Sequence, residues 1–115
     1  MRLPHIKKAY VPETKLSGYL LAADHASGRS KALFLNNLGF RKEQPDVLRR
    51  ALLQHAADNA VSSIQQTHFG AKYLIEGRIS GPTGAAAAIR SVWFVESGER
   101  RPRFVTAYPL RGTQR

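Results

Sequence analysis

The period of the hydrophobic pattern changes once along this chain, close to residue 59. Before that point apolar residues recur at helical spacing, and after it they alternate with polar residues, which is typical of strands. The alternating part predicts four strands, over residues 61–67, 71–80, 85–96 and 101–108. Only three or four residues, rich in turn formers, separate each strand from the next. Connections this short join antiparallel neighbours, because a parallel crossover needs about a dozen residues or more.

The N-terminal half carries the helical pattern. Pro4 and Pro12, with no clear period between them, predict an irregular or extended arm. A short helix is expected over residues 13–21. A second helix is expected over about residues 28–38, with Ser27 as its N-cap. Both are shorter than the third expected helix, which begins at Pro45.

Helical spacing also identifies the faces that we expect to be buried. In the second helix Ala32, Leu35 and Leu38 line one side, Leu33 and Phe34 widen it, and a left-handed stop is expected at the following glycine, Gly39. The third helix begins with Pro45 and Asp46 and continues to Asn59. Its apolar face is formed by Leu48, Ala51, Leu52, His55 and Ala56.

Together these elements predict an α+β fold, in which two or three N-terminal helices pack on a four-stranded antiparallel β-meander. With 115 residues the chain suits a single domain over residues 1–115, whose core we expect over about residues 10–109. Alternation places Phe104, Thr106 and Tyr108 on one face of the last strand. Neither face of the sheet is purely apolar, so we expect helices on one side and a partly aromatic, partly cationic surface on the other.

The chain is strongly basic. Its 18 Lys and Arg residues against eight Asp and Glu residues give a formal net charge of +10. Residues 51–89 are neutral overall, whereas residues 1–50 carry +6 and residues 90–115 carry +4. Such an excess of positive charge points to a polyanionic partner, and the candidates are nucleic acid, an acidic membrane surface and an acidic protein. The alternative is a solvated basic surface that only keeps the protein soluble.

Several kinds of chemistry are excluded by what the sequence lacks. The absence of cysteine rules out disulfides, thiol catalysis and cysteine-based metal sites. The four histidines have no metal-ligand spacing, the carboxylates are scattered, and no phosphate-binding glycine loop occurs, so we expect neither metal nor cofactor. No apolar run is long enough for a secretory signal or a membrane span, so we expect a cytoplasmic protein without a membrane partner.

The remaining polar residues suit phosphodiester cleavage in RNA without a metal. Such cleavage needs a base for the 2′-OH, cations for the phosphorane and an acid for the leaving oxygen. A histidine side chain can serve as acid or base near neutral pH, and His25 lies in the polar segment before the second helix. Arg29 and Lys31 follow at the N-terminus of that helix, which favours anion binding. The alternative is that His25 is a loop or capping residue and Lys31 a solvated charge.

Arg90 interrupts an otherwise apolar strand, so it is either paired, extended towards solvent or functional. Glu76 and Glu96 are the carboxylates with which it could pair. If Arg90 is functional, it can hold the scissile phosphate with two parallel hydrogen bonds. The candidate catalytic residues are therefore His25, Lys31, Arg90, Thr106 and Tyr108.

Thr106 and Tyr108 point the same way and are expected near Arg90 or Trp93, although ordinary strand propensity also explains them. A second set of residues is expected to bind nucleic acid through stacking and phosphate contacts. For Tyr73 and Trp93 the alternative is packing in the core or on the sheet face. The members of this set are Arg29, Tyr73, Trp93, Arg101 and Arg103.

Specific segments of the sequence resemble a bacterial family of domains of unknown function. They include the pattern LL-x3-H-x2-GR-x-KA in residues 20–32, HFGAKYLIEGRISGP in residues 68–82, IRSVWFVESG in residues 89–98 and VTAYP in residues 105–109. The resemblance covers about residues 3–110. The helices-then-meander order is also similar to that of the barnase–EndoU–colicin–RelE group of ribonuclease toxins.

This resemblance implies stand-alone proteins or toxin modules, and a toxin would need a cognate antitoxin or immunity protein, which is expected to be acidic. One departure from the family pattern is the alanine run at residues 85–88, where a more polar strand start is typical. The recurring motif positions that the resemblance implies are His25, Gly28, Lys31, Tyr73, Arg90, Trp93, Thr106 and Tyr108.

The sequence therefore favours a metal-independent ribonuclease toxin that binds RNA and cleaves it by acid–base catalysis with 2′-OH attack. Three alternatives stay open. The first is a module that binds nucleic acid without catalysis, and the second is a basic immunity or adaptor protein that binds a partner. The third is a toxin that acts on a nucleotide cofactor, because His, Arg and Tyr would serve that substrate equally well.

Overall fold

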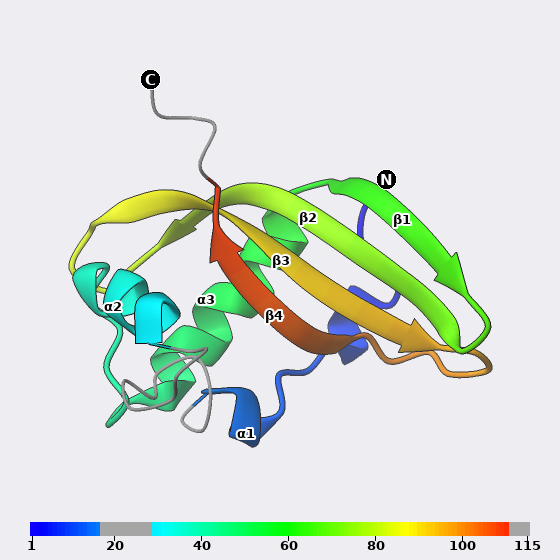
Figure 1. The fold of residues 1–115 in the computed structure, drawn as a ribbon, viewed down its shortest axis with the longest axis horizontal. Coiled ribbons are helices and arrows are strands. Elements are labelled where there is room, and N and C mark those ends of the chain that lie inside the picture. The colour runs from blue at the N-terminus through cyan, green and yellow to red at the C-terminus, as the bar shows by residue number, and fades with distance from the viewer. Residues whose placement is uncertain (17–28, 111–115) are drawn as a thin grey trace.

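A computed structural model describes residues 1–16 and 29–110, with the backbone alone for residues 29–31 (Figure 1). Four helices come first in the described part, and four strands follow them. The helices are η1 (Ile6–Lys8), α1 (Glu13–Lys15), α2 (Arg29–Asn37) and α3 (Pro45–Asp58), and the strands are β1 (Val61–Thr67), β2 (Gly70–Ser80), β3 (Ala86–Glu96) and β4 (Arg103–Pro109). No helix in these described ranges is long and apolar enough to cross a membrane.

The strands form one antiparallel sheet in the order β1-β2-β3-β4, so the predicted meander is confirmed. The helices pack on one face of this sheet, as the expected α+β fold requires (Figure 1). Strand bounds differ from the predicted ones by at most two residues. The helix expected over residues 13–21 begins at the predicted residue, but most of its length lies outside the described residues.

The third predicted helix is confirmed as α3. Pro45 occupies its first turn and Asp46 places a carboxylate there, which favours the positive end of the helix dipole. Four residues at helical spacing are buried and face the sheet, and they are Leu48, Leu52, His55 and Ala56. Their burial joins α3 to the hydrophobic core beneath β2 and β3 (Figure 1).

The left-handed stop predicted at Gly39, just after helix α2, is confirmed. This glycine has a φ of 98°, and the Phe40 N–H bonds the Leu35 carbonyl at 3.1 Å while the Gly39 N–H bonds the Asn36 carbonyl at 2.9 Å. This pair of bonds is the Schellman motif, which satisfies the last carbonyls of a helix. Ala32, Leu35 and Leu38 are buried as expected, but Leu33 is 57% exposed, because it lies on the opposite side of the helix.

The N-terminal arm crosses from one edge of the sheet to the other. The Val61 N–H bonds the Met1 carbonyl at 2.6 Å, and further along the arm the Tyr10 N–H bonds the Pro102 carbonyl at 3.0 Å. Leu3 and Val11 are buried in the same cluster as the helices and strands. Apart from the short helix η1 the arm is irregular, and its buried residues Leu3 and Val11 are part of the core.

A β-bulge decides which side chains of β4 face the core. Pairing joins Arg90 to Tyr108 and Val92 to Thr106, but the register shifts before Trp93, which pairs with Phe104. Because paired residues share a face, Phe104 points inward with Trp93, while Thr106 and Tyr108 point outward with Arg90. The expectation that all three β4 residues share one face is therefore wrong, because simple alternation does not account for the extra residue.

Four residues form a buried chain of hydrogen bonds between α3 and the sheet. The Trp93 Nε1–H donates to Ser91 Oγ at 2.9 Å, and Ser91 Oγ lies 3.1 Å from His55 Nδ1. His55 Nε2 lies 3.2 Å from the Gly77 carbonyl, which can only accept, so Nε2 carries the proton. His55 Nδ1 then accepts the Ser91 hydroxyl proton. With His55 neutral, each of these polar atoms has a partner within the chain of bonds.

The first prediction concerns pH. Burial lowers the pKa of His55 below its ordinary value of 6.5, although the bond to Gly77 opposes this. The unfolded chain therefore binds more protons than the folded protein once the pH falls below about 6.5, and the free energy of unfolding decreases. Between about pH 7 and about pH 5 we expect His55 to account for a loss of up to about 2 kcal/mol, measured by urea unfolding.

The His55→Gln variant tests this assignment, because glutamine has no proton to gain in this range. Its stability should vary less with pH than that of the original protein. The matched control is His5→Gln, the same substitution at an exposed position outside the buried chain of hydrogen bonds. Identical pH profiles for His55→Gln and the original protein would contradict the prediction.

A second prediction concerns Gly81 in the β2–β3 turn. A Cβ atom at this position would lie 1.8 Å from the Leu38 carbonyl oxygen at the end of α2, which is backbone and cannot move aside. We expect Gly81→Ala to lower the free energy of unfolding by about 3 kcal/mol. Gly84→Ala is the control in the same turn, because its φ is 95° but the space beside it is open, and about 1 kcal/mol is expected. Equal losses would show that the contact with α2 is unimportant.

Candidate functional site on the outer sheet face

The face of the sheet that points away from the described helices carries most of the candidate residues. Pairing across the strands arranges it in rows, and an uncharged row separates two charged rows. We call this surface the outer face. Its residues are Lys72, Leu74, Glu76 and Arg78 of β2, Arg90, Val92 and Phe94 of β3, and Arg103, Thr106 and Tyr108 of β4.

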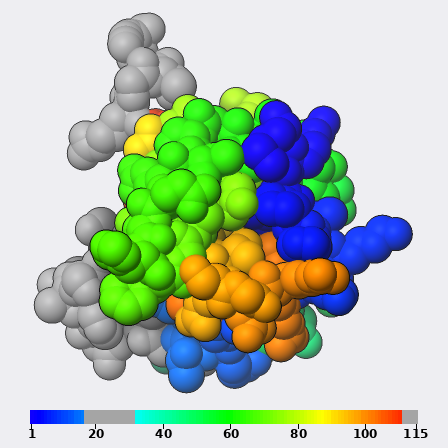
Figure 2. Space-filling model, turned by 90° about the vertical axis from the view of Figure 1, so that its right-hand side faces the viewer, coloured from blue at the N-terminus to red at the C-terminus, as the bar shows by residue number. Residues whose placement is uncertain are grey.

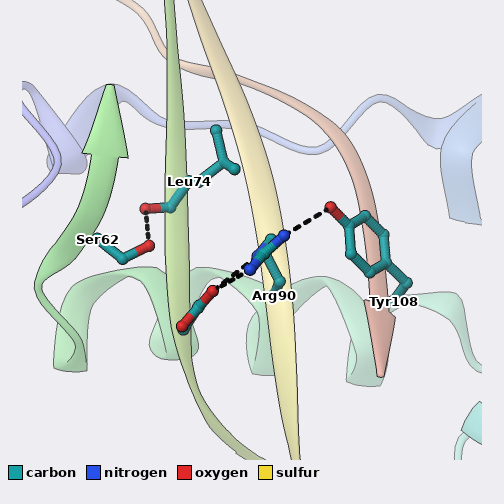
Figure 3. Close-up of polar contacts among 5 residues, drawn as sticks. Ser62, Leu74, Arg90 and Tyr108 are labelled. Atoms are coloured by element: carbon teal, nitrogen blue, oxygen red, sulfur yellow. Dashed lines mark hydrogen bonds and ion pairs between the residues drawn. The ribbon is translucent and has the colours of Figure 1, made fainter. Parts of the chain in front are cut away.

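Arg90 lies at the centre of one charged row, between Glu76 and Tyr108 (Figure 3). Its Nε donates to Glu76 Oε2 at 2.8 Å, and its Nη2 forms an ion pair with the same oxygen. Its Nη1 lies 3.4 Å from the Tyr108 hydroxyl oxygen, on the other side of the guanidinium. Of the predicted catalytic residues with described side chains, the structure thus brings Arg90 and Tyr108 into contact.

The contacts of Arg90 hold its positive charge while leaving it able to bind a ligand. Hydrogen bonds to Tyr108 and to Glu76 raise the pKa of Arg90, so the guanidinium stays charged. Three of its five N–H groups have the partners named above, which leaves two for an oxyanion. The Tyr108 oxygen accepts from Arg90, so its own O–H can donate elsewhere. The row therefore offers several donors that suit a phosphate group.

Glu76 belongs to this site but was not among the candidate catalytic or nucleic-acid-binding residues. The sequence identified it as one of two possible partners of Arg90, and the structure selects it because the two residues are directly opposite in the β2–β3 register. The other candidate, Glu96, instead forms an ion pair with Arg103, in which Oε2 lies 3.8 Å from Nη2. The sequence signal for Glu76 was indirect: an arginine in an apolar strand requires a partner, and Glu76 was one of the two carboxylates available.

Thr106 lies one row away from Arg90, opposite Val92. It is half-buried and shares the outer face with Tyr108. Of the remaining predicted residues, His25 lies outside the described residues, and the side chains of Arg29 and Lys31 are not described. The helix that carries Arg29 and Lys31 packs beside β4, where Phe34 and Tyr108 line the same small apolar pocket.

The predicted stacking residues do not lie on the outer face. Trp93 is fully buried, forms an edge-to-face pair with Phe104 and donates to Ser91, so it offers no ring face to a base. Tyr73 is half-buried and packs against the core from the same side of the sheet. Trp93 therefore has the packing role that the sequence left as the alternative, and Tyr73 lies on the same side of the sheet. Phe94, which the predicted set lacks, is the aromatic residue of β3 that points outward.

Comparison with protein families places the chain in the family described as domain of unknown function DUF6883. The family model matches residues 2–111, so the chain belongs to this family over almost its whole length. This agrees with the resemblance seen in the sequence. A comparison with curated proteins finds no match.

Comparison with solved structures finds a similar fold. A chain of the "Contact-dependent growth inhibition toxin - immunity protein complex from Klebsiella pneumoniae 342" aligns with a TM-score of 0.70 and 22% sequence identity. The alignment covers 94% of the present chain and 98% of that chain. The two chains therefore share a fold along nearly their full lengths.

Proposed function

We propose that this protein is the toxin of a toxin–antitoxin or polymorphic-toxin system and that it cleaves RNA without a metal. The observation that carries the proposal is the Arg90–Tyr108 contact on a sheet face that is rich in cations and points away from the described helices. The similar fold in a toxin–immunity complex supports a role on one side of such a pair. The net charge of +10 favours the toxin, because an RNA-cleaving protein must attract a polyanion.

In the proposed reaction the 2′-oxygen of the substrate attacks the adjacent phosphorus, and the bond to the 5′-oxygen breaks. A base takes the 2′-OH proton, an acid returns a proton to the 5′-oxygen, and the products are a 2′,3′-cyclic phosphate and a 5′-hydroxyl end. Arg90 would bind the non-bridging oxygens with its two remaining N–H groups. The Tyr108 hydroxyl would donate a hydrogen bond to the same phosphate, where negative charge develops.

The other proposed roles follow from residue chemistry. We assign His25 as acid or base, because its ordinary pKa allows both functions near neutral pH. Lys31 would supply a second cation to the phosphate, and Thr106 would position the phosphate or a water molecule. Glu76 would act as a positioning residue, because its carboxylate holds Nε and Nη2 and so fixes the plane of the Arg90 guanidinium.

The main test is Arg90→Lys, since lysine keeps the charge but loses the forked geometry. We expect purified protein to cleave total RNA in EDTA, and the variant to cleave it roughly 100-fold more slowly or worse. Arg50→Lys is the matched control, because Arg50 is exposed on α3, away from the outer face. Absence of cleavage by the original protein, together with unchanged growth of cells that express it, would refute the proposal.

A separate prediction distinguishes Glu76 from the residues that contact RNA. Glu76→Gln preserves the shape of the side chain but weakens its hold on Arg90. We expect a drop in cleavage rate of about tenfold, smaller than for Arg90→Lys, with the pH profile of the rate unchanged. A pH profile that loses one limb would instead assign proton transfer to Glu76.

The ion pair between Arg90 and Glu76 favours a second candidate, a module that binds nucleic acid without cleaving it. A paired arginine can track phosphates without taking part in catalysis. In that case binding should weaken steeply with added salt, and His25→Ala should have no effect on it. Binding without turnover would select this candidate. In either case an acidic antitoxin or immunity protein is the proposed protein partner.

A further inference from the structure

A second site lies at the other end of the outer face, where the β3–β4 loop meets the N-terminal arm (Figure 2). A pocket of about 80 Å³ opens there, which is several times the roughly 10–15 Å³ that one water molecule needs. We call it the loop pocket. Its lining residues are Tyr10, Phe94, Glu96, Glu99, Arg101 and Arg103.

One wall of the loop pocket is a stacked pair of planar groups. The guanidinium carbon of Arg101 lies 3.9 Å from the centroid of the Tyr10 ring, and its Nε lies 3.4 Å from the Lys8 carbonyl. The backbone of Tyr10 is held on both sides, because its N–H bonds the Pro102 carbonyl and its carbonyl accepts the Phe104 N–H, each at 3.0 Å. The wall is therefore built before any ligand arrives.

The charges of the residues that line the loop pocket balance. Arg101 and Arg103 supply two positive charges, and Glu96 and Glu99 supply two negative charges. The Arg103 Nη2 atom lies 3.8 Å from Glu96 Oε2, and the guanidinium carbon of Arg103 lies 5.9 Å from the centroid of the Phe94 ring. A balanced pocket of this kind is unsuited to a phosphate or a carboxylate, which would face the two glutamates. It suits a neutral planar ring that carries hydrogen-bond donors.

We propose that the loop pocket binds a nucleobase with an exocyclic amino group. Arginine and tyrosine planes are the surfaces on which unpaired bases stack, and a carboxylate accepts hydrogen bonds from an amino group of a base. Adenine, cytosine and guanine carry such a group, and uracil does not. This inference deepens the proposed function and rests on it, because the base belongs to the RNA that lies on the outer face.

The position of the loop pocket fits this role. Phe94 is four residues from Arg90 on β3 and points to the same face, which corresponds to about 13 Å along the strand. Between them lies the uncharged row of Leu74, Val92 and Thr106, which has no negative charge to repel the backbone of an RNA strand. A nucleotide near the scissile phosphate could thus place its base in the loop pocket while Arg90 holds the phosphate.

The experiment measures base preference in binding, separately from cleavage. The probes are fluorescent 2′-O-methyl RNA hexamers of adenosine, cytidine or uridine, which lack the nucleophile and cannot be cut by 2′-OH attack. Fluorescence anisotropy in EDTA gives their dissociation constants. We expect the adenosine and cytidine hexamers to bind about tenfold more tightly than the uridine hexamer, because only they can donate an amino hydrogen to the glutamates.

Glu99→Ala removes one acceptor from the loop pocket, and Glu43→Ala removes an exposed carboxylate elsewhere. Both variants gain affinity for phosphate through the lost negative charge, so the ratio between hexamers is the informative quantity. We expect the ratio to fall to about twofold in Glu99→Ala and to stay at the original value in Glu43→Ala. A melting curve for each variant checks that it is folded.

The two proposals can fail separately. Equal affinities for the three hexamers, or an unchanged ratio in Glu99→Ala, would overturn the loop pocket assignment even if the protein cleaves RNA. Conversely, a protein that cleaves no RNA but retains the ratio in Glu43→Ala and loses it in Glu99→Ala would refute the proposed ribonuclease and support the nucleobase site.

Discussion

The buried hydrogen-bond chain from Trp93 through Ser91 and His55 to Gly77 is the interaction on which the rest of the arrangement depends. It joins the middle of α3 to the two central strands, in a place where an unsatisfied polar atom would be costly. Because Trp93 and Ser91 must face the helix, their neighbours Arg90, Val92 and Phe94 must face away from it. The same few bonds therefore separate the core from the outer face.

The β4 bulge completes this division. Without it, Tyr108 and Phe104 would share a face, and either the core would lose an aromatic ring or Arg90 would lose its neighbour. With the extra residue, Phe104 packs on Trp93 while Tyr108 lies beside Arg90. Bulges often redirect side chains next to functional sites, and here one irregularity serves both the core and the site.

The candidate site combines residues that differ in how far they could be foreseen. Arg90 is a charge in an apolar strand, which requires a partner or a function. Its contact with Tyr108 follows from the pairing of consecutive strands. The sequence limited the partner of Arg90 to two carboxylates, Glu76 and Glu96, and did not decide between them. Trp93 and Tyr73 were expected to bind nucleic acid, yet they pack towards the core. Alternation separates the two faces of a strand but does not indicate which face the helices cover, so the sequence does not show whether an aromatic residue is buried.

The sequence by itself determined the order of helices and strands, the antiparallel meander, the stop of α2 at Gly39 and the basic character of the protein. These features depend on contacts between near neighbours in the chain, such as hydrophobic period, turn residues and short connections. Only the tertiary structure decided the β4 bulge, the pairing of Arg90 with Glu76 and the loop pocket, in which Tyr10 meets Arg101. Those features depend on register and on residues far apart in the chain, where several arrangements satisfy the same local pattern and packing selects one.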